Sequence, residues 1–260
     1  GINAIEFDGL ISKDNIPVLY HDYTLNTNMV KDKNGNWIDN FDLKIMDLTY
    51  DQISNYSIES LKPGSGYSDR FKNQKAVQGA KIPKLIDLFQ LANKENYKDV
   101  FLNLEVKSNP DLKDVTPEPK EMVATILKDI KDYNLEDRIV VTSFDWRILY
   151  VLKKQNPNVL RGFLTLQQNL GSTKKNIYEN SPWINKEFTM EELFLLPNII
   201  KSIEGHVWSA FYRDITKQNV ELAHKQGLAV NVWTVNREQD IIRMIEYGVD
   251  GIITDYPKKV

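Results

Sequence analysis

The chain has 260 residues, 42% of them hydrophobic and 27% charged, a composition typical of a globular chain that can bury a full core. Its formal net charge of −3 gives no general attraction to nucleic acids or anionic membranes. It contains no cysteine, which excludes disulfides, cysteine metal ligands and thiolate catalysis. No apolar run approaches the roughly 20 residues that cross a bilayer.

The first two dozen residues predict a strand, a turn and a second short strand. In the sequence AIEFD, Glu6 and Asp8 lie two positions apart, so an extended chain directs both to the same side. Lys13-Asp14-Asn15 is typical of a tight turn, and residues 17–21 then bring His21 back near the carboxylates. Two carboxylates on one side repel each other unless a cation or a basic side chain lies between them. The pattern predicts a metal site beside an acid–base group; the alternative is a surface hairpin with ordinary charged residues.

The next segment is polar and irregular. Residues 24–40 are rich in Asn, Asp and Lys, and residues 45–53 predict a short helix or a turn-rich excursion. Residues 62–79 predict an ordered surface loop. So long an excursion inside a compact domain often covers a site.

From residue 83 the pattern becomes a regular alternation of helices and strands. Helical spacing of apolar residues predicts helices over 83–95, 119–133, 145–155, 190–203, 216–225 and 238–247. Mostly apolar runs predict strands over 100–106, 138–144, 159–166, 207–212, 228–235 and 251–255. Asp145 and Thr189 are expected N-caps, and Pro197 is expected to break or kink its helix. The alternation predicts a parallel sheet with helices outside it, within a single domain over residues 1–260.

Several motifs resemble, in chain order, those of the glycerophosphodiester phosphodiesterase family. They are the Glu-x-Asp strand with its Lys-Asp turn and Pro-Val-x-x-His-Asp strand, Ile82-Pro83-Lys84-Leu85, LNLEVK ending at Lys107, SFDWR from Ser143, and residues 248–257. Residues 56–74 are similar to an insertion found in a longer subgroup. The resemblance covers essentially the whole chain. It implies a TIM-type (β/α)8 barrel with an insertion at about 23–80, between the second and third strands.

The family places a His-Arg-Gly strand and a helix before the residues that match here. The resemblance therefore implies that the first strand and helix of the barrel are absent from this sequence. Without them, the sequence holds one of the two histidines that the family uses. If the natural protein lacks them too, a non-catalytic binding protein on the same barrel, or a fragment without independent function, becomes the favoured alternative.

The resemblance also assigns roles to residues at the ends of strands, where such barrels place catalytic groups. Its metal carboxylates match Glu6, Asp8 and Glu105, and three carboxylates suit a hard divalent cation, Ca²⁺ or Mg²⁺. Its second catalytic histidine matches His21, and its phosphate-contacting lysine matches Lys107. Without the resemblance, the Glu105–Lys107 pair would be read as a salt-bridged strand end.

Two aromatic residues, Phe144 and Trp233, fall near strand ends, where they either wall an alcohol pocket or pack in the core. The remaining histidines, His206 and His224, belong to no motif and are expected to be structural or solvent-facing. Asp255 is expected to cap or close the last strand.

The function implied by the resemblance is hydrolysis of a small-molecule glycerophosphodiester to glycerol 3-phosphate and an alcohol. A phospholipase D-like or lysophospholipid-cleaving activity is the alternative, and an exposed apolar rim at residues 178–184 would favour it. The absence of cysteine is compatible with either side of a membrane, and we favour a periplasmic or secreted location over a cytoplasmic one. The sequence does not determine the alcohol, the metal or the oligomeric state.

Overall fold

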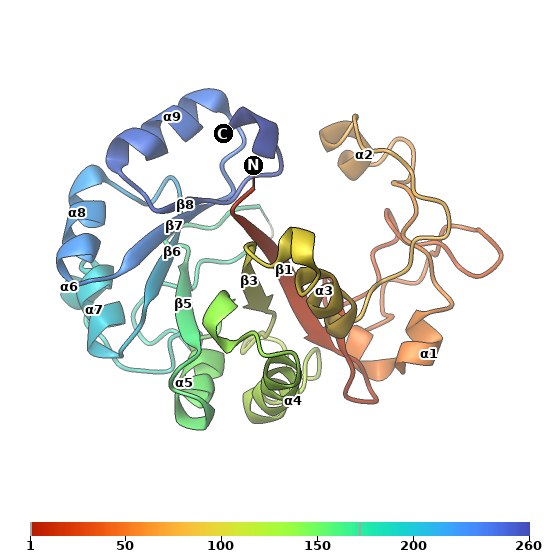
Figure 1. Cartoon of the computed structure of the whole chain (residues 1–260), viewed down its shortest axis with the longest axis horizontal. Helices are drawn as coiled ribbons and strands as arrows, with labels where there is room; N and C mark the ends of the chain where they lie inside the picture. Colours follow the sequence, from red (N-terminus) through yellow and green to blue (C-terminus); the bar gives the residue numbers. More distant parts are fainter. Residues whose placement is uncertain (1, 172) are drawn as a thin grey trace. The chain divides into compact units, whose positions relative to one another are not determined.

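The computed structural model describes residues 2–171 and 173–260, and its strands and helices alternate along the chain as the sequence predicts (Figure 1). The chain divides into two compact units. The first comprises Gly1–Glu6, Asp99–Asp111 and Asn134–Val260, and the second comprises Phe7–Lys98 and Leu112–Tyr133. The strand β1 (Ala4–Ile11) runs from the first unit into the second.

The first unit contains the parallel strands. Their order in the sheet is β1, β3, β4, β5, β6, β7 and β8, and each neighbouring pair from β3 to β8 is parallel. The strands after β1 are β3 (Phe101–Val106), β4 (Ile139–Ser143), β5 (Leu160–Thr165), β6 (Val207–Phe211), β7 (Ala229–Trp233) and β8 (Gly251–Ile252). Every residue of β4 and β6 is buried, as expected for strands covered on both faces. The predicted parallel sheet is confirmed.

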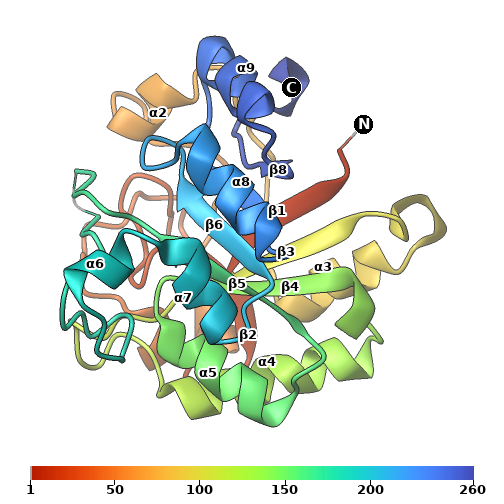
Figure 2. The same ribbon diagram turned by 90° about the vertical axis from the view of Figure 1, so that its left-hand side faces the viewer.

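Helices of the first unit follow the strands and lie outside them; Figures 1 and 2 show α7 and α8 side by side along the outer side of the sheet. They are α5 (Trp146–Gln155), α6 (Met190–Leu193), α7 (Leu196–Ser202), α8 (Lys217–Lys225) and α9 (Glu238–Tyr247). The predicted caps are confirmed: the Asp145 side chain accepts from the backbone N–H of Arg147, and Thr189 forms a capping box with Glu192.

The helix predicted over residues 190–203 is interrupted, as expected from Pro197. The structure has two helices, α6 and α7, separated at Phe194 and Leu195. The break falls just before the proline: Pro197 lies in the first turn of α7, where its missing N–H leaves no intrahelical bond unmade.

The second unit begins with an antiparallel hairpin. The end of β1 pairs with β2 (Pro17–Leu19), with Gly9 opposite Leu19 and Ile11 opposite Pro17. The predicted turn is confirmed: Asn15 adopts a positive φ of 58°, and the hydroxyl of Ser12 donates to Asp14 and accepts from the N–H of Ile16. Pairing with β2 extends β1 to Ile11, beyond the predicted end at Asp8.

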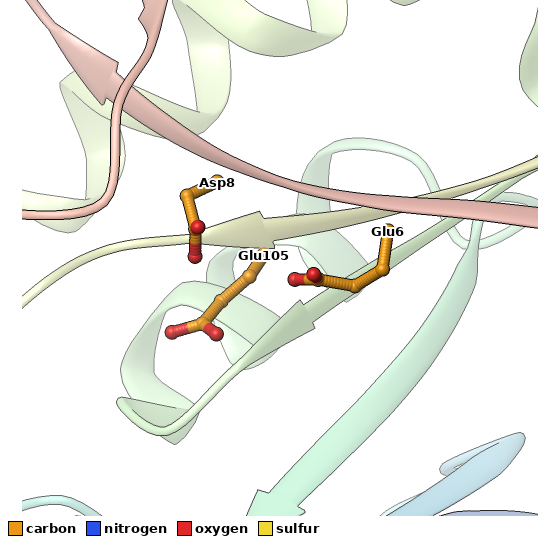
Figure 3. A group of neighbouring side chains, drawn as sticks. All are labelled: Glu6, Asp8 and Glu105. Atoms are coloured by element: carbon orange, nitrogen blue, oxygen red, sulfur yellow. The ribbon is translucent and has the colours of Figure 1, made fainter. Parts of the chain in front are cut away.

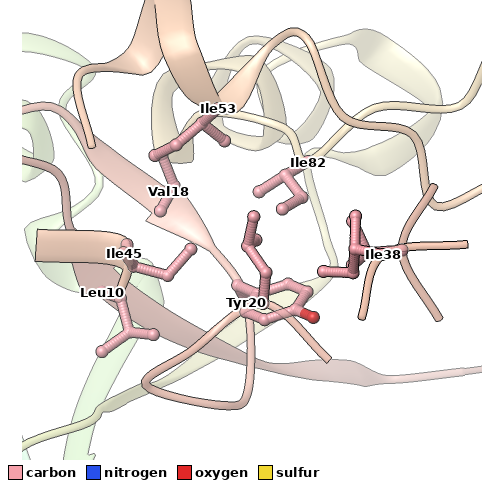
Figure 4. Close-up of a cluster of buried hydrophobic side chains, with 9 residues drawn as sticks. Leu10, Val18, Tyr20, Ile38, Ile45, Ile53 and Ile82 are labelled. Atoms are coloured by element: carbon pink, nitrogen blue, oxygen red, sulfur yellow. The ribbon is translucent and has the colours of Figure 1, made fainter. Parts of the chain in front are cut away.

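The second unit has a hydrophobic core, drawn in Figure 4, to which both the hairpin and the insertion between β2 and β3 contribute. This core is lined by aliphatic side chains and one tyrosine that are less than a tenth exposed: Leu10, Val18, Tyr20, Leu25, Val30, Ile38, Ile45, Ile53 and Ile82. The helices of this unit are α1 (Tyr50–Ile53), α2 (Gly66–Arg70), α3 (Leu85–Ala92) and α4 (Pro119–Asp132). Short 3₁₀ turns of the whole chain are η1 (Ile45–Asp47), η2 (Glu95–Tyr97), η3 (Glu136–Arg138) and η4 (Pro257–Lys259).

The ordered loop predicted over residues 62–79 contains a short helix, α2, that the sequence does not predict. Ser65 starts this helix by accepting a hydrogen bond from the N–H of Ser68. Over residues 2–171 and 173–260, no helix is both long and apolar enough to cross a bilayer.

We predict that Ile82→Ala lowers the free energy of unfolding by about 2–5 kcal/mol, because the side chain is fully buried and its removal leaves a cavity in the core of the second unit. Urea unfolding followed by circular dichroism measures the change. Val77→Ala is the control: its side chain is 63% exposed, so the expected change is within about 0.5 kcal/mol. Equal effects of the two substitutions would show that this core does not stabilise the fold.

Candidate active site

The strand β1 carries the first two acidic side chains. Successive residues of a strand point to opposite faces, so Glu6 and Asp8 share one face while Phe7, which is 9% exposed, points to the other. Both acids are partly buried. The pattern of alternation seen in the sequence is therefore realised in the structure.

The strand β3 supplies the third acid. Glu105 lies near the end of β3, opposite Thr142 of β4, and is 9% exposed. Glu6, Asp8 and Glu105 each offer a carboxylate oxygen, and these oxygens all lie within 4.8 Å of one another (Figure 3). In the figure the three carboxylates point toward one another. The convergence that the sequence predicts is present.

The donors of this cluster decide which ligand it fits. Carboxylate oxygens alone, without imidazole or thiolate, suit hard cations such as Ca²⁺ and Mg²⁺. Three negative charges this close repel each other, and a divalent cation would offset that repulsion. The residues present therefore fit a divalent cation, which Glu6, Asp8 and Glu105 would hold.

Lys107 follows directly after β3, two positions beyond Glu105. Asn103, Glu105 and Lys107 alternate along the strand, all less than a tenth exposed, and thus share one face. The Lys107 ammonium lies 2.8 Å from a carboxylate oxygen of Glu105. The salt bridge that the sequence offered as an alternative thus exists together with the acidic cluster.

The segment after Lys107 is held by a buried carboxylate. Ser108 donates its hydroxyl proton to Oδ2 of Asp145 at 2.7 Å, and Arg147 binds both oxygens of Asp145, the closer contact being 2.7 Å. Asp145 is fully buried. The sequence predicted Asp145 only as a helix cap. Its bond with Ser108 was not predicted, because the two residues follow different strands and are far apart in the chain.

The hairpin determines where His21 lies. The N–H of Tyr20 donates to the carbonyl of Asp8 at 3.1 Å, so His21 follows directly after the residue bonded to Asp8. The His21 ring contacts Asp22 through Nδ1 at 2.7 Å, and its side chain is 68% exposed. The predicted return of the chain toward β1 is confirmed for the backbone, and the catalytic role of His21 stays a prediction.

The other two histidines make contacts that account for them structurally. Nδ1 of His206 accepts the backbone N–H of Arg161 at 3.2 Å, and burial, reinforced by Arg161, lowers its pKa. His224 pairs with Asp250 at 2.9 Å on the surface. Asp255, which lies beyond the end of β8 at Ile252, accepts from the side chain of Asn236 at 2.7 Å.

The two predicted pocket aromatics lie together. The rings of Phe144 and Trp233 meet edge to face with centroids 5.2 Å apart, and Phe211 lies 5.3 Å from Trp233. Both predicted residues are partly exposed, so their place as a pocket wall stays a prediction. In residues 178–184, Trp183 and Ile184 are buried, and the exposed apolar rim considered from the sequence is not formed by these two side chains.

Fold and site together define a class of protein, an α/β-barrel enzyme with an acidic cluster suited to a divalent cation. The chain belongs to the glycerophosphoryl diester phosphodiesterase family, whose model matches residues 1–259. It is thus an enzyme of the glycerophosphodiester phosphodiesterase class, as the resemblance of its motifs implied.

Individual relatives match over nearly the whole chain. A glycerophosphodiester phosphodiesterase from Caldanaerobacter subterraneus is 31% identical over 258 residues, which is 99% of this chain and 84% of that protein. A structure from Silicibacter pomeroyi, assigned as a glycerophosphoryl diester phosphodiesterase, superposes with a TM-score of 0.84 at 32% identity, covering 100% of this chain and 82% of that one. An Oleispira antarctica phosphodiesterase, determined in complex with the product sn-glycerol-3-phosphate, has a TM-score of 0.68 at 21% identity, over 100% of this chain and 83% of that one.

We predict that Glu105→Gln weakens binding of Ca²⁺ or Mg²⁺ by at least about tenfold, because one of the converging carboxylates loses its charge. Isothermal titration calorimetry with each metal measures the affinity. Glu95→Gln removes the same charge from a side chain that is 81% exposed and paired with Lys98, and it should leave the affinity unchanged. An unaltered titration of the Glu105 variant would contradict the assignment of this cluster as a cation site.

Proposed function

We propose that the protein uses a divalent cation to hydrolyse a glycerophosphodiester to glycerol 3-phosphate and an alcohol. The observation that carries the proposal is the group of three converging carboxylates with Lys107 beside one of them. The product found in the Oleispira antarctica phosphodiesterase supports the choice of glycerol 3-phosphate as the released phosphate ester.

The charges of the substrate explain what such a site must do. A phosphodiester is an anion and resists attack by a nucleophile, so its charge has to be neutralised. A cation held by Glu6, Asp8 and Glu105 would supply positive charge and Lewis acidity for this purpose. Lys107, held by Glu105 at 2.8 Å, presents a second positive charge that favours the more negative transition state.

Acid–base catalysis is the second requirement. An imidazole has an ordinary pKa near 6.5, and His21 is the histidine that the motif and the hairpin favour for proton transfer at neutral pH. The resemblance assigns the other proton transfer to the histidine of a His-Arg-Gly strand, and this sequence contains no such tripeptide. The His21 side chain therefore represents one half of the proposed acid–base pair.

We predict that the protein releases glycerol 3-phosphate from at least one of glycerophosphocholine, glycerophosphoethanolamine and glycerophosphoglycerol. A lysophosphatidylcholine, whose hydrolysis would give a lysophosphatidic acid and choline, is assayed beside them. An enzyme-coupled assay for glycerol 3-phosphate measures release, and assay of the free alcohol detects cleavage of the lysophospholipid. A chelator should abolish turnover, and Ca²⁺ or Mg²⁺ added in excess should restore it. Cleavage of the lysophospholipid alone would favour the lysophospholipase D-like alternative. Metal binding without any turnover would favour the binding protein.

We predict that His21→Ala retains the affinity for the cation but loses turnover by about 10²–10⁴-fold, the usual contribution of a positioned acid–base group. Metal titration and the rate of glycerol 3-phosphate release measure the two properties separately. His224→Ala removes an imidazole that is paired with Asp250 on the surface and should leave both unchanged. Turnover at the normal rate in the His21 variant would remove this residue from the mechanism.

A further inference from the structure

The carboxylate of Asp22 joins two side chains in the segment after β2. Its Oδ1 lies 2.7 Å from Nδ1 of His21, and its Oδ2 accepts a hydrogen bond from Nδ2 of Asn26, also at 2.7 Å. A carboxylate has only acceptor oxygens, so the ring nitrogen that contacts it carries a proton. In the neutral ring, Nδ1 is then the protonated nitrogen, and Nε2 is the nitrogen that can accept a proton.

Both the backbone and the side chain of Asn26 are held by hydrogen bonds. Its own N–H donates to the hydroxyl of Tyr20 at 2.9 Å, and its carbonyl accepts from Met29 and Val30, each at 2.9 Å. Its side-chain Oδ1 accepts from the N–H of Asn28 at 2.9 Å. Because that donor requires an oxygen, the amide has one orientation, with Nδ2 directed at Asp22.

The anchor of this arrangement is the core of the second unit. Tyr20 is 7% exposed and belongs to the hydrophobic core of the second unit, and its N–H is bonded to the carbonyl of Asp8. The contact between Tyr20 and Asn26 thus ties the amide to a part of the chain that cannot move without disrupting that core. Asp22 is held from this rigid side, while the ring of His21 remains 68% exposed.

The insertion also contributes Tyr67 of α2. Burial raises the pKa of Tyr67, the charge of Asp22 raises it further, and a hydrogen bond with Asn26 acts in the opposite direction. These influences place the phenol beside the Asp22–Asn26 pair. Tyr67 belongs to residues 62–79, the segment that the sequence predicts to cover a site. This segment therefore contacts the Asp22–Asn26 pair.

A second contact to Asp22 has a physical consequence for His21. An exposed pair such as His21–Asp22 contributes little by itself, because water competes and both side chains lose conformational freedom. When Asn26 holds the second carboxylate oxygen, the rotamer of Asp22 is fixed before the imidazole docks. The conformational entropy of the Asp22 side chain is then already lost when the protein folds. A partner fixed in this way keeps a histidine in one orientation and one tautomer.

We propose that Asn26 is a positioning residue for His21, acting through Asp22 to hold the imidazole in the tautomer with Nδ1 protonated. The kinetic consequence rests on the proposed function, in which His21 exchanges a proton with the substrate or water. The tautomer and the orientation of the ring do not depend on it.

Nuclear magnetic resonance of the imidazole nitrogens tests the tautomer directly, and the chain contains three histidines, so assignment is tractable. At about pH 8.5, where an imidazole of ordinary pKa is neutral, His21 of the unaltered protein should show a protonated Nδ1. In Asn26→Ala the two tautomers should mix. Asn28→Ala is the matched control: it removes an amide two positions away but keeps the backbone N–H that binds Asn26, and the His21 spectrum should not change.

Asn26→Asp is a second variant that tests the same contact if Asn26→Ala does not fold. It keeps the size and the acceptor for Asn28, but it replaces the donor to Asp22 with a second carboxylate, so it should release His21 in the same way. A His21 spectrum that stays unchanged in whichever of these variants folds overturns the proposal.

Kinetics separate positioning from a general structural role. On a diester that the protein hydrolyses, Asn26→Ala should lower kcat by about tenfold and change KM by less than about twofold. In a His21→Ala background the same substitution should have no further effect, because the residue through which it acts is gone. An equal loss in both backgrounds overturns the proposal. Absence of turnover on every diester would instead refute the proposed function, and the spectra would still decide the role of Asn26.

Discussion

Repulsion among Glu6, Asp8 and Glu105 is the constraint on which the site depends. At 4.8 Å and an effective dielectric constant of about 20, each pair of charges repels by about 3 kcal/mol. Flexible loops would relieve this by moving apart. Here the acids are attached to β1 and β3, whose backbones are fixed by sheet hydrogen bonds, so the repulsion is retained as a preference for a cation. Lys107, 2.8 Å from a carboxylate oxygen of Glu105, offsets part of it.

The same strand that carries two of the acids also starts the hairpin that carries His21. Pairing of β1 with β2 fixes the register, and one further hydrogen bond, from Tyr20 to Asp8, continues it to the residue before the histidine. A slip of one residue would move every side chain of β2 to the other face. The aliphatic core of the second unit prevents the slip, because Val18 and Tyr20 must both stay buried. Core packing in the second unit thus serves the chemistry as well as the stability.

The parts of this structure that the sequence predicts are those with local causes. Alternation along a strand places Glu6 and Asp8 together, and the caps at Asp145 and Thr189 need only the neighbouring turn. The helix α2 has no such signal: its sequence GYSDR is short and begins with glycine, a poor helix former. The bond from Ser108 to Asp145 depends on tertiary packing. Asn26, in a polar segment, gives no indication in the sequence that its amide meets Asp22.

The two aspartates that organise the strand ends illustrate how burial sets function. Asp145 is fully buried, and Ser108 and Arg147 bind its oxygens, so removal of Arg147 would leave a buried charge without its compensating partner. Such a group is suited to holding β3 and β4 in place. The Asp22 side chain is 29% exposed and shares its two oxygens between a fixed amide and an imidazole that faces solvent. Water reduces the energy of that contact but also gives the histidine access to substrate. Fixing Asp22 from the protein side allows an exposed imidazole to keep one orientation, which neither full burial nor full exposure would permit.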